Sequence, residues 1–258
     1  MGSKVIVVKV SSTGSIAERA QQLHELLNKT LPGQQVNLLG HSMGGLDGRY
    51  LISRIPNEDK KYKVKSLTTI STPHRGSSFM DWCRDHLKVG KISSEEKIKD
   101  KHERQQWFER VMSYLDAPAY SHLTTDYCRN KFNPSTPDDP NVAYYSYNAY
   151  LDKMHYLSFL NFPWQIINQV EGKNDGLVSL KSGEWGQLVE TVQANHFDLV
   201  VRFRWLTAIG RVIGYEDARY NINPSLSLPK TLLLSPETEF DNIEFYLRLS
   251  TFLHCKGF

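Results

Sequence analysis

One pentapeptide in the first quarter of the chain has residue types and spacing suited to nucleophilic chemistry. Gly40-His41-Ser42-Met43-Gly44 fits the pattern G-x-S-x-G. An apolar stretch precedes it and a helix-like stretch follows it, which is the context of a serine raised on a tight strand-to-helix turn. We therefore predict that Ser42 is the nucleophile, and that Gly40 and Gly44 are glycines because side chains there would collide with neighbouring elements. The Met43 N–H, at the start of the helix, is the expected oxyanion donor. The alternative is a glycine-rich turn with an incidental serine.

Two later segments supply the partners that such a serine needs. A serine hydroxyl is a weak nucleophile until a base removes its proton. Where this pattern occurs, the acid and then the base follow the serine along the chain. Asn174-Asp175-Gly176 and Asn195-His196 follow in that order, 21 residues apart. They predict Asp175 as the acid, at the carboxyl edge of a sheet, and His196 as the base, against the alternative of a surface histidine.

Three other histidines have expected places of their own. His24 is expected on the solvent side of a helix, and His41 is expected to point away from Ser42. His74 follows a strand end, where we expect a structural or pocket-lining residue.

The elements that must position these residues alternate between strands and helices. β-branched and apolar runs predict strands, and apolar residues at helical spacing predict helices, the first with a capping box of Ser15 and Glu18. The predicted strands are 5–10, 35–39, 64–71, 142–147 and 168–171, and the predicted helices are 16–31, 46–55, 199–213 and 242–254. This order predicts an α/β fold with a mostly parallel sheet and helices on both faces.

The chain is expected to form a single domain over residues 1–258, with two additions. Residues 78–141 are polar, charged and punctuated by prolines, which suggests a lid-like insertion over the sheet, and residues 216–258 form a helical extension. Within the insertion, the apolar-rich stretch 107–115 could cover an acyl pocket or be an ordinary packed helix. The aromatic stretch 157–164 lines a pocket or fills the core.

Composition narrows the class of protein. A net charge of +3 on 258 residues is too mild to predict a nucleic-acid partner. The odd number of cysteines, three, indicates free thiols in a reducing, intracellular compartment. No stretch approaches the ~18 apolar residues of a membrane helix, so we expect any membrane contact to be peripheral.

Four motifs, in order, carry a resemblance to a known family. The segments 40–47 (GHSMGGLD), 71–77 (STPHRGS), 174–179 (NDGLVS) and 195–198 (NHFD) resemble those of the fungal mitochondrial triacylglycerol lipases and, more distantly, of secreted bacterial triacylglycerol lipases. The resemblance spans about residues 1–215. It implies an α/β-hydrolase fold and hydrolysis of acylglycerols by Ser42, Asp175 and His196. It also implies a mitochondrial location, with the cytoplasm or a lipid droplet as alternatives, and contact with a membrane or droplet surface.

The same resemblance leaves three points open. The family carries a His-Gly-rich loop, which donates a second oxyanion N–H, and no such motif precedes residue 5. A truncated or non-catalytic lipid-binding relative is therefore one alternative, and an esterase, phospholipase or acyltransferase is another. No cofactor is required, although the bacterial relatives imply a structural calcium site, for which Asp198 and Asp152 are candidates. Helix capping is the competing role for Asp198.

Overall fold

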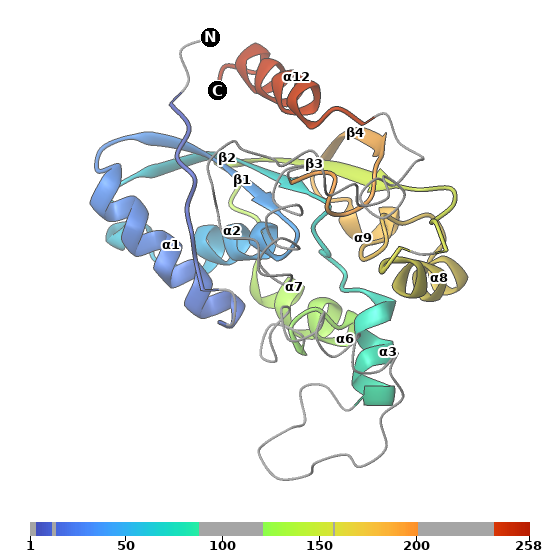
Figure 1. Cartoon of the computed structure of the whole chain (residues 1–258). Helices are drawn as coiled ribbons and strands as arrows, with labels where there is room; N and C mark the ends of the chain where they lie inside the picture. Colours follow the sequence, from blue (N-terminus) through green and yellow to red (C-terminus); the bar gives the residue numbers. More distant parts are fainter. Residues whose placement is uncertain (1–3, 12–13, 88–120, 157, 201–239) are drawn as a thin grey trace, which may run out of the picture.

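The sheet consists of four parallel strands. The computed structural model describes residues 4–11, 14–87, 121–156, 158–200 and 240–258 (Figure 1). Its strands lie side by side in chain order and are β1 (Gln35–His41), β2 (Lys63–Ile70), β3 (Ala143–Tyr150) and β4 (Gln187–Gln193). All pairs are parallel, so the carboxyl ends share one edge, where His41, Ile70 and Tyr147 are neighbours in the register. Loops that follow the strands therefore meet at this edge.

Helices α1 (Ile16–Thr30) and α2 (Met43–Arg54) cover the β1–β2 part of one face. The predicted capping box starts α1, because the Ser15 side chain accepts from the Glu18 N–H and the Glu18 side chain accepts from the Ser15 N–H. The apolar side of α1, including Ala20 and Leu27, packs with side chains of α2, β1 and β2. Both helices are therefore fixed by burial as well as by local signals.

The opposite face is covered by α12 (Asn242–Cys255), which lies above the sheet in Figure 1. Its buried residues Phe245, Leu249 and Leu253 form one cluster with side chains of β3 and β4, such as Tyr147 and Val192. The prediction of a helix at 242–254 is confirmed, and helices do lie on both faces.

The free thiols predicted for the three cysteines are also observed.

The connections between strands contain the remaining helices. Between β1 and β2 lies η1 (Asn57–Asp59), and between β2 and β3 lie α3 (Ser78–Leu87), α6 (Thr125–Tyr127), the π-helical η2 (Cys128–Phe132) and α7 (Asn133–Ser135). Between β3 and β4 lie α8 (Asn161–Val170) and α9 (Leu180–Gly183). Residues 78–141 thus lie between β2 and β3, and the 107–115 stretch of the predicted insertion lies outside the described residues.

The strand predicted at residues 5–10 is not formed. Residues 4–11 have no regular secondary structure, and Val5 and Val7 are 83% and 92% exposed. A β-branched run becomes a strand only where a neighbouring backbone pairs with it. Among the described residues, β2 is the strand that pairs with β1, so residues 4–11 have no place in the sheet.

The last strand was predicted in the wrong place. Residues 168–171 end helix α8, where Pro163 and Ile167 are buried at helical spacing. The last strand of the described residues, β4, was missed because it lies at the edge of the described sheet with mostly exposed or half-buried side chains and therefore no apolar run. The aromatic stretch after residue 157 fills the core at Leu160 but leaves Phe162 at 44% exposure.

The predictions for His24 and for a helix at 199–213 are not confirmed. His24 is not on the solvent side of α1: it is buried at 6% exposure, with Nδ1 3.1 Å from the Tyr62 hydroxyl oxygen. Of the helix predicted at 199–213, residues 201–213 lie outside the described part of the chain. Among the helices described, none has the length and apolar character needed to cross a membrane.

Candidate active site

Ser42 lies at the junction between β1 and α2 in a strained backbone conformation. It is the N-cap residue of α2, with φ 54° and ψ −132°, a region that non-glycine residues rarely adopt. The conformation is maintained because the Ser42 N–H donates to the Ile70 carbonyl of β2 at 2.9 Å. Such outliers cost about 1–3 kcal/mol and concentrate at functional sites. The predicted strand-to-helix turn is thus present around Ser42.

The glycines of this turn differ from the prediction in one respect. A Cβ on Gly40 would lie 2.6 Å from the Gly44 carbonyl oxygen and the Gly45 nitrogen, so glycine is required there. A Cβ on Gly44 would meet nothing within 4 Å, which contradicts the expected collision. The second tight position is Gly45, where a Cβ would lie 2.7 Å from Thr72 Cγ2 of the neighbouring loop. Gly45, outside the pentapeptide, lets the first turn of α2 approach β2.

Met43 is the first residue of α2 and is buried at 8% exposure. The first N–H groups of a helix have no acceptor within the helix. The Met43 N–H therefore lies at the positive end of the α2 dipole, directly after Ser42.

Asp175 and His196 form a fully buried pair, although 21 residues separate them. Asp175 Oδ2 lies 2.7 Å from His196 Nδ1, and the two residues are 0% and 2% exposed. Asp175 Oδ1 accepts from the Leu177 and Val178 N–H groups at 2.9 and 2.8 Å. An ionised carboxylate has no proton to donate, so it can only accept a hydrogen bond from the imidazole. We infer that His196 carries its proton on Nδ1, which leaves the Nε2 lone pair available.

The loop with Asp175 is fixed by the residue before it. Asn174 is fully buried; its side chain accepts from the Gly176 N–H and donates to the Trp164 and Gly172 carbonyls. Its backbone bridges to Leu151, immediately after β3. Asp175 thus reaches the carboxyl edge of the sheet through this bridge, and not from a strand of its own as predicted. The role of Asn174 was missed, because one asparagine in a turn gives no distinguishing signal.

His41 connects the turn of Ser42 to the Asp175–His196 pair; these four residues are called the constellation below. Its Nε2 lies 3.1 Å from the His196 carbonyl oxygen, and the two rings are 4.6 Å apart between centroids. Burial lowers the pKa of His41 well below its ordinary value, and the nearby charge of His196 lowers it further. Since His41 precedes Ser42 in the chain, this contact brings the Asp175–His196 pair next to the strained turn.

His74 does not belong to this group, as the sequence predicted for a structural histidine. It is completely buried, with Nε2 3.1 Å from Thr69 Oγ1 and its ring stacked on Trp185. Burial lowers its pKa well below the ordinary value, and the charges of Arg49 and Arg75 lower it further. The side chain therefore packs as a neutral ring.

The two calcium candidates, Asp198 and Asp152, have protein partners. Asp198 accepts from the Asn195 N–H at 3.1 Å and so caps its own turn. Asp152 is exposed, and its Oδ1 lies 3.1 Å from the Lys173 ammonium. This oxygen is thus already paired with a cation, whereas calcium binds through carboxylate oxygens. Within the described residues, no group of three or more His, Cys, Asp or Glu side chains could hold a metal ion.

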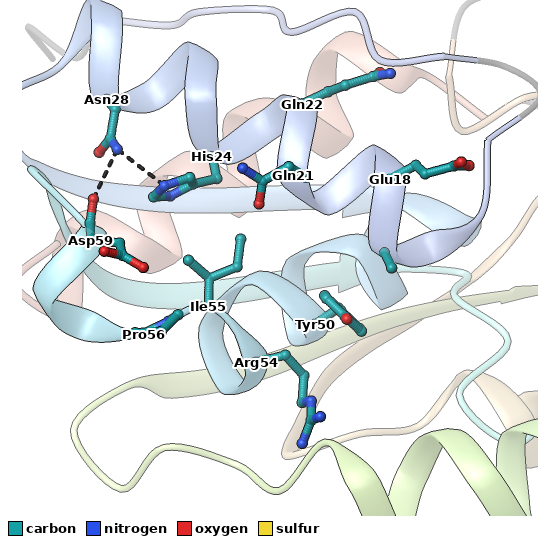
Figure 2. A pocket seen from close by; sticks show the side chains of 11 residues that line it. Glu18, Gln21, Gln22, His24, Asn28, Tyr50, Arg54, Ile55, Pro56 and Asp59 are labelled. Atoms are coloured by element: carbon teal, nitrogen blue, oxygen red, sulfur yellow. Dashed lines mark hydrogen bonds between the residues drawn. The ribbon is translucent and has the colours of Figure 1, made fainter.

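A surface groove lies elsewhere among the described residues. An open groove of about 860 Å³ runs between α1 and the end of α2 and is lined by Glu18, His24, Tyr50 and Arg54 among others (Figure 2). His24 and Asn28 satisfy each other there, and Asn28 also donates to the Asp59 carbonyl. No residue lining this groove belongs to the constellation around Ser42, so the groove is not part of the candidate site.

Comparisons with known sequences place the chain among families of acyl hydrolases. The model of a family described as palmitoyl protein thioesterase matches residues 7–185. Triacylglycerol lipase 2 of Saccharomyces cerevisiae is 37% identical over 209 residues, which are 77% of this chain and 58% of that protein. A triacylglycerol lipase of Pseudarthrobacter phenanthrenivorans is 41% identical over 94 residues, 34% of this chain and 28% of that one. The resemblance to triacylglycerol lipases is confirmed, and the chain spans little more than half of the yeast relative.

Solved structures confirm the fold class. A Bacillus licheniformis lipase in its mature form is similar with a TM-score of 0.58 and 19% identity, covering 78% of this chain and 75% of that one. A metagenomic carboxyl esterase is similar with the same score and identity, over 74% and 54% of the two chains. At this identity the likeness establishes the α/β-hydrolase fold alone.

Proposed function

This chain belongs to the palmitoyl protein thioesterase family, and on that premise we propose that it is a serine hydrolase of fatty-acyl esters, with triacylglycerol as substrate. The observation that carries the proposal is the buried contact of 2.7 Å between Asp175 and His196, next to the strained turn of Ser42. The similarity to triacylglycerol lipases supports the choice of substrate.

In the first half of the proposed reaction, His196 Nε2 takes the proton of the Ser42 hydroxyl while Oγ attacks the acyl carbonyl carbon. The resulting tetrahedral oxyanion accepts a hydrogen bond from the Met43 N–H, at the positive end of α2. Asp175 stabilises the imidazolium that forms. The C–O bond to glycerol then breaks, the leaving alkoxide takes the proton from Nε2, and an acyl-Ser42 ester remains.

In the second half, water replaces the alcohol. His196 Nε2 removes a proton from water as its oxygen attacks the acyl carbon, and collapse of the intermediate returns that proton to Ser42 Oγ. The products are a fatty acid and a diacylglycerol. Since triacylglycerol is insoluble in water, we propose that the substrate is met at a lipid surface, either a membrane or a droplet.

A fatty-acyl thioester is the second candidate substrate. The family description favours it, because the matching model is that of a palmitoyl protein thioesterase and covers residues 7–185. The same three residues would serve, since the attack occurs at the acyl carbonyl and only the leaving group differs. A thiolate leaves more readily than an alkoxide and needs less help from the His196 proton.

A fluorophosphonate probe tests the nucleophile directly. The wild-type chain should be labelled, and Ser42→Ala should not, although both fold. Three substrates then separate the candidates: emulsified triacylglycerol, a palmitoyl thioester and a soluble short-chain ester. We expect the highest kcat/KM with triacylglycerol; a preference for the thioester would favour the second candidate. A folded wild-type chain without labelling would refute the proposed function.

A further inference from the structure

His41 contacts His196 with both its ring and its hydrogen-bonding edge. The rings are 4.6 Å apart at an interplanar angle of 45°, and Nε2 lies 3.1 Å from the His196 carbonyl oxygen. The two residues are 155 positions apart. His41 ends β1, whereas His196 lies in the loop after β4, at the other side of the sheet. The loop after β4 therefore reaches back along the carboxyl edge of the sheet to the end of β1.

The chemistry of the contact fixes the state of the His41 ring. A carbonyl oxygen can only accept, so Nε2 of His41 must carry a proton and donate it. Burial and the neighbouring His196 lower the pKa of His41 and keep the ring neutral. A neutral neighbour does not oppose the positive charge that His196 acquires when it takes the serine proton.

Three fixed contacts then define the position of His196. The Asp175 carboxylate holds Nδ1, the Asp175 carbonyl accepts the His196 N–H at 2.9 Å, and His41 donates to the His196 carbonyl. The first two contacts come from Asp175, in a loop far from Ser42 in the chain. Of these three contacts, only the one with His41 links His196 to the residue that precedes Ser42 in the chain.

From this geometry we propose that His41 is a positioning residue that holds the base His196 in register with Ser42, through its Nε2–H bond to the His196 carbonyl. This inference rests on the proposed serine-hydrolase function. Misplacement of a reacting group by about 1 Å can cost roughly 10²-fold in rate. Loss of the bond should therefore lower kcat, and not raise KM, because His41 acts through His196 and not on the substrate.

Two variants separate the hydrogen bond from ring packing. His41→Phe keeps a ring against His196 but removes the donor. His41→Gln restores an N–H at the same number of bonds from the backbone. We expect His41→Phe to lower kcat on a soluble ester roughly 10- to 100-fold with KM nearly unchanged, and His41→Gln to recover most of this loss. The rate of fluorophosphonate labelling should change in parallel.

A control variant and a spectroscopic readout exclude a merely structural role. His24→Phe removes another buried, hydrogen-bonded histidine, in α1 and outside the constellation, and should leave kcat per folded molecule unchanged. The downfield proton signal of His196 Nδ1–H should be sharp in the wild type and in His41→Gln, and broadened in His41→Phe.

The outcomes distinguish this inference from the function on which it rests. If the folded wild type is not labelled, both the function and the positioning role are refuted. If the wild type is labelled but His41→Phe matches its kcat, only the positioning role is refuted. Failure of His41→Gln to recover the rate would also overturn it, since the donated hydrogen bond would not be the cause.

Discussion

At the scale of single residues, Ser42 is the proposed nucleophile and also has an unfavourable backbone conformation. Its φ of 54° and ψ of −132° suit glycine better than any residue with a Cβ. Ser42→Gly and Ser42→Ala both remove the hydroxyl, but only glycine relieves the strain. We expect the glycine variant to be more stable than the alanine variant by about 1 kcal/mol, the strain relieved less the added entropy of the unfolded chain. Urea unfolding measures the difference; the ordinary order, with alanine more stable, would show that no strain is stored.

Asp175 determines which nitrogen of His196 carries the proton. In Asp175→Asn, the amide oxygen can still accept from the Leu177 and Val178 N–H groups, which turns the NH₂ group toward His196. Nδ1 must then accept, so the proton moves to Nε2 and the base is lost. We expect kcat to fall by about 10⁴ with the fold intact. A fall of less than about tenfold, measured on a soluble ester, would contradict the inferred tautomer.

Sequence reasoning at this scale found residues that belong to motifs and missed those that act by contact. Ser42, Asp175 and His196 stand in segments whose order along the chain is itself a signal, and the structure brings the latter two together. The contact of His41 with His196 depends on how the loop after β4 folds back, which no local pattern encodes. Asn174 was missed for the same reason.

At the scale of elements, the first turn of α2 is fixed by how closely it approaches β2. A Cβ on Gly45 would lie 2.7 Å from Thr72 Cγ2 and 2.9 Å from Thr69 Cγ2, whereas one on Gly44 would enter open space. Gly45→Ala should therefore destabilise the fold by about 1–3 kcal/mol through overpacking. Gly44→Ala should be neutral or stabilise it by up to about 1 kcal/mol, from helix propensity. Urea unfolding of the pair tests this; equal effects would show that the packing at Gly45 is not limiting.

A buried ion pair joins α1 to α2. Arg19 of α1 donates to both carboxylate oxygens of Asp47 of α2, at 2.7 to 3.1 Å. Burial raises the pKa of Asp47 to about 6, although the hydrogen bonds and charge of Arg19 lower it. The folded pKa thus lies above the value of about 3.9 in an unfolded chain. The contribution of Asp47 to stability is then complete below about pH 4 and is lost as the pH rises through 6.

The comparison with Asp47→Asn isolates this titration, because the amide does not ionise. We expect the free energy of unfolding of the wild type, relative to the variant, to fall by an amount on the order of 3 kcal/mol from pH 4 to pH 7. Urea unfolding at a series of pH values measures it. A relative stability that rises with pH would show that Arg19 outweighs burial and lowers the pKa instead.

Elements were predictable where burial leaves a pattern in the sequence. Strands β2 and β3 have mostly buried side chains, and α1 has both a capping box and an apolar stripe. Strand β1 is a short apolar run in which Val36 and Gly40 are buried. β4 has neither, because it is the last strand of the described sheet and its side chains are mostly exposed or half-buried. Residues 4–11 show the reverse case, in which a strand-like composition is not paired with any strand among the described residues.

At the scale of the whole molecule, the described helices cover different parts of the two faces of the sheet. α1 and α2 pack on β1 and β2, whereas α12 packs on the opposite face around β3 and β4. Leu39 of β1 is left 48% exposed beside the outer edge of the sheet. Open edges of sheets with apolar neighbours favour pairing between copies, and parallel sheets are usually covered on both faces.

We therefore expect the chain to self-associate through the β1 edge, and Leu39→Lys to weaken this association. Withdrawing one leucine contact removes about 1.5–3 kcal/mol, so the dissociation constant should rise about tenfold or more. Val170→Lys is the matched control, because Val170 is 69% exposed at the end of α8, away from the sheet edge. Sedimentation velocity at a series of concentrations measures both variants. If Val170→Lys weakens association as much as Leu39→Lys, general surface hydrophobicity and not the β1 edge drives it; a wild type that stays monomeric throughout would show that the exposed edge is already protected.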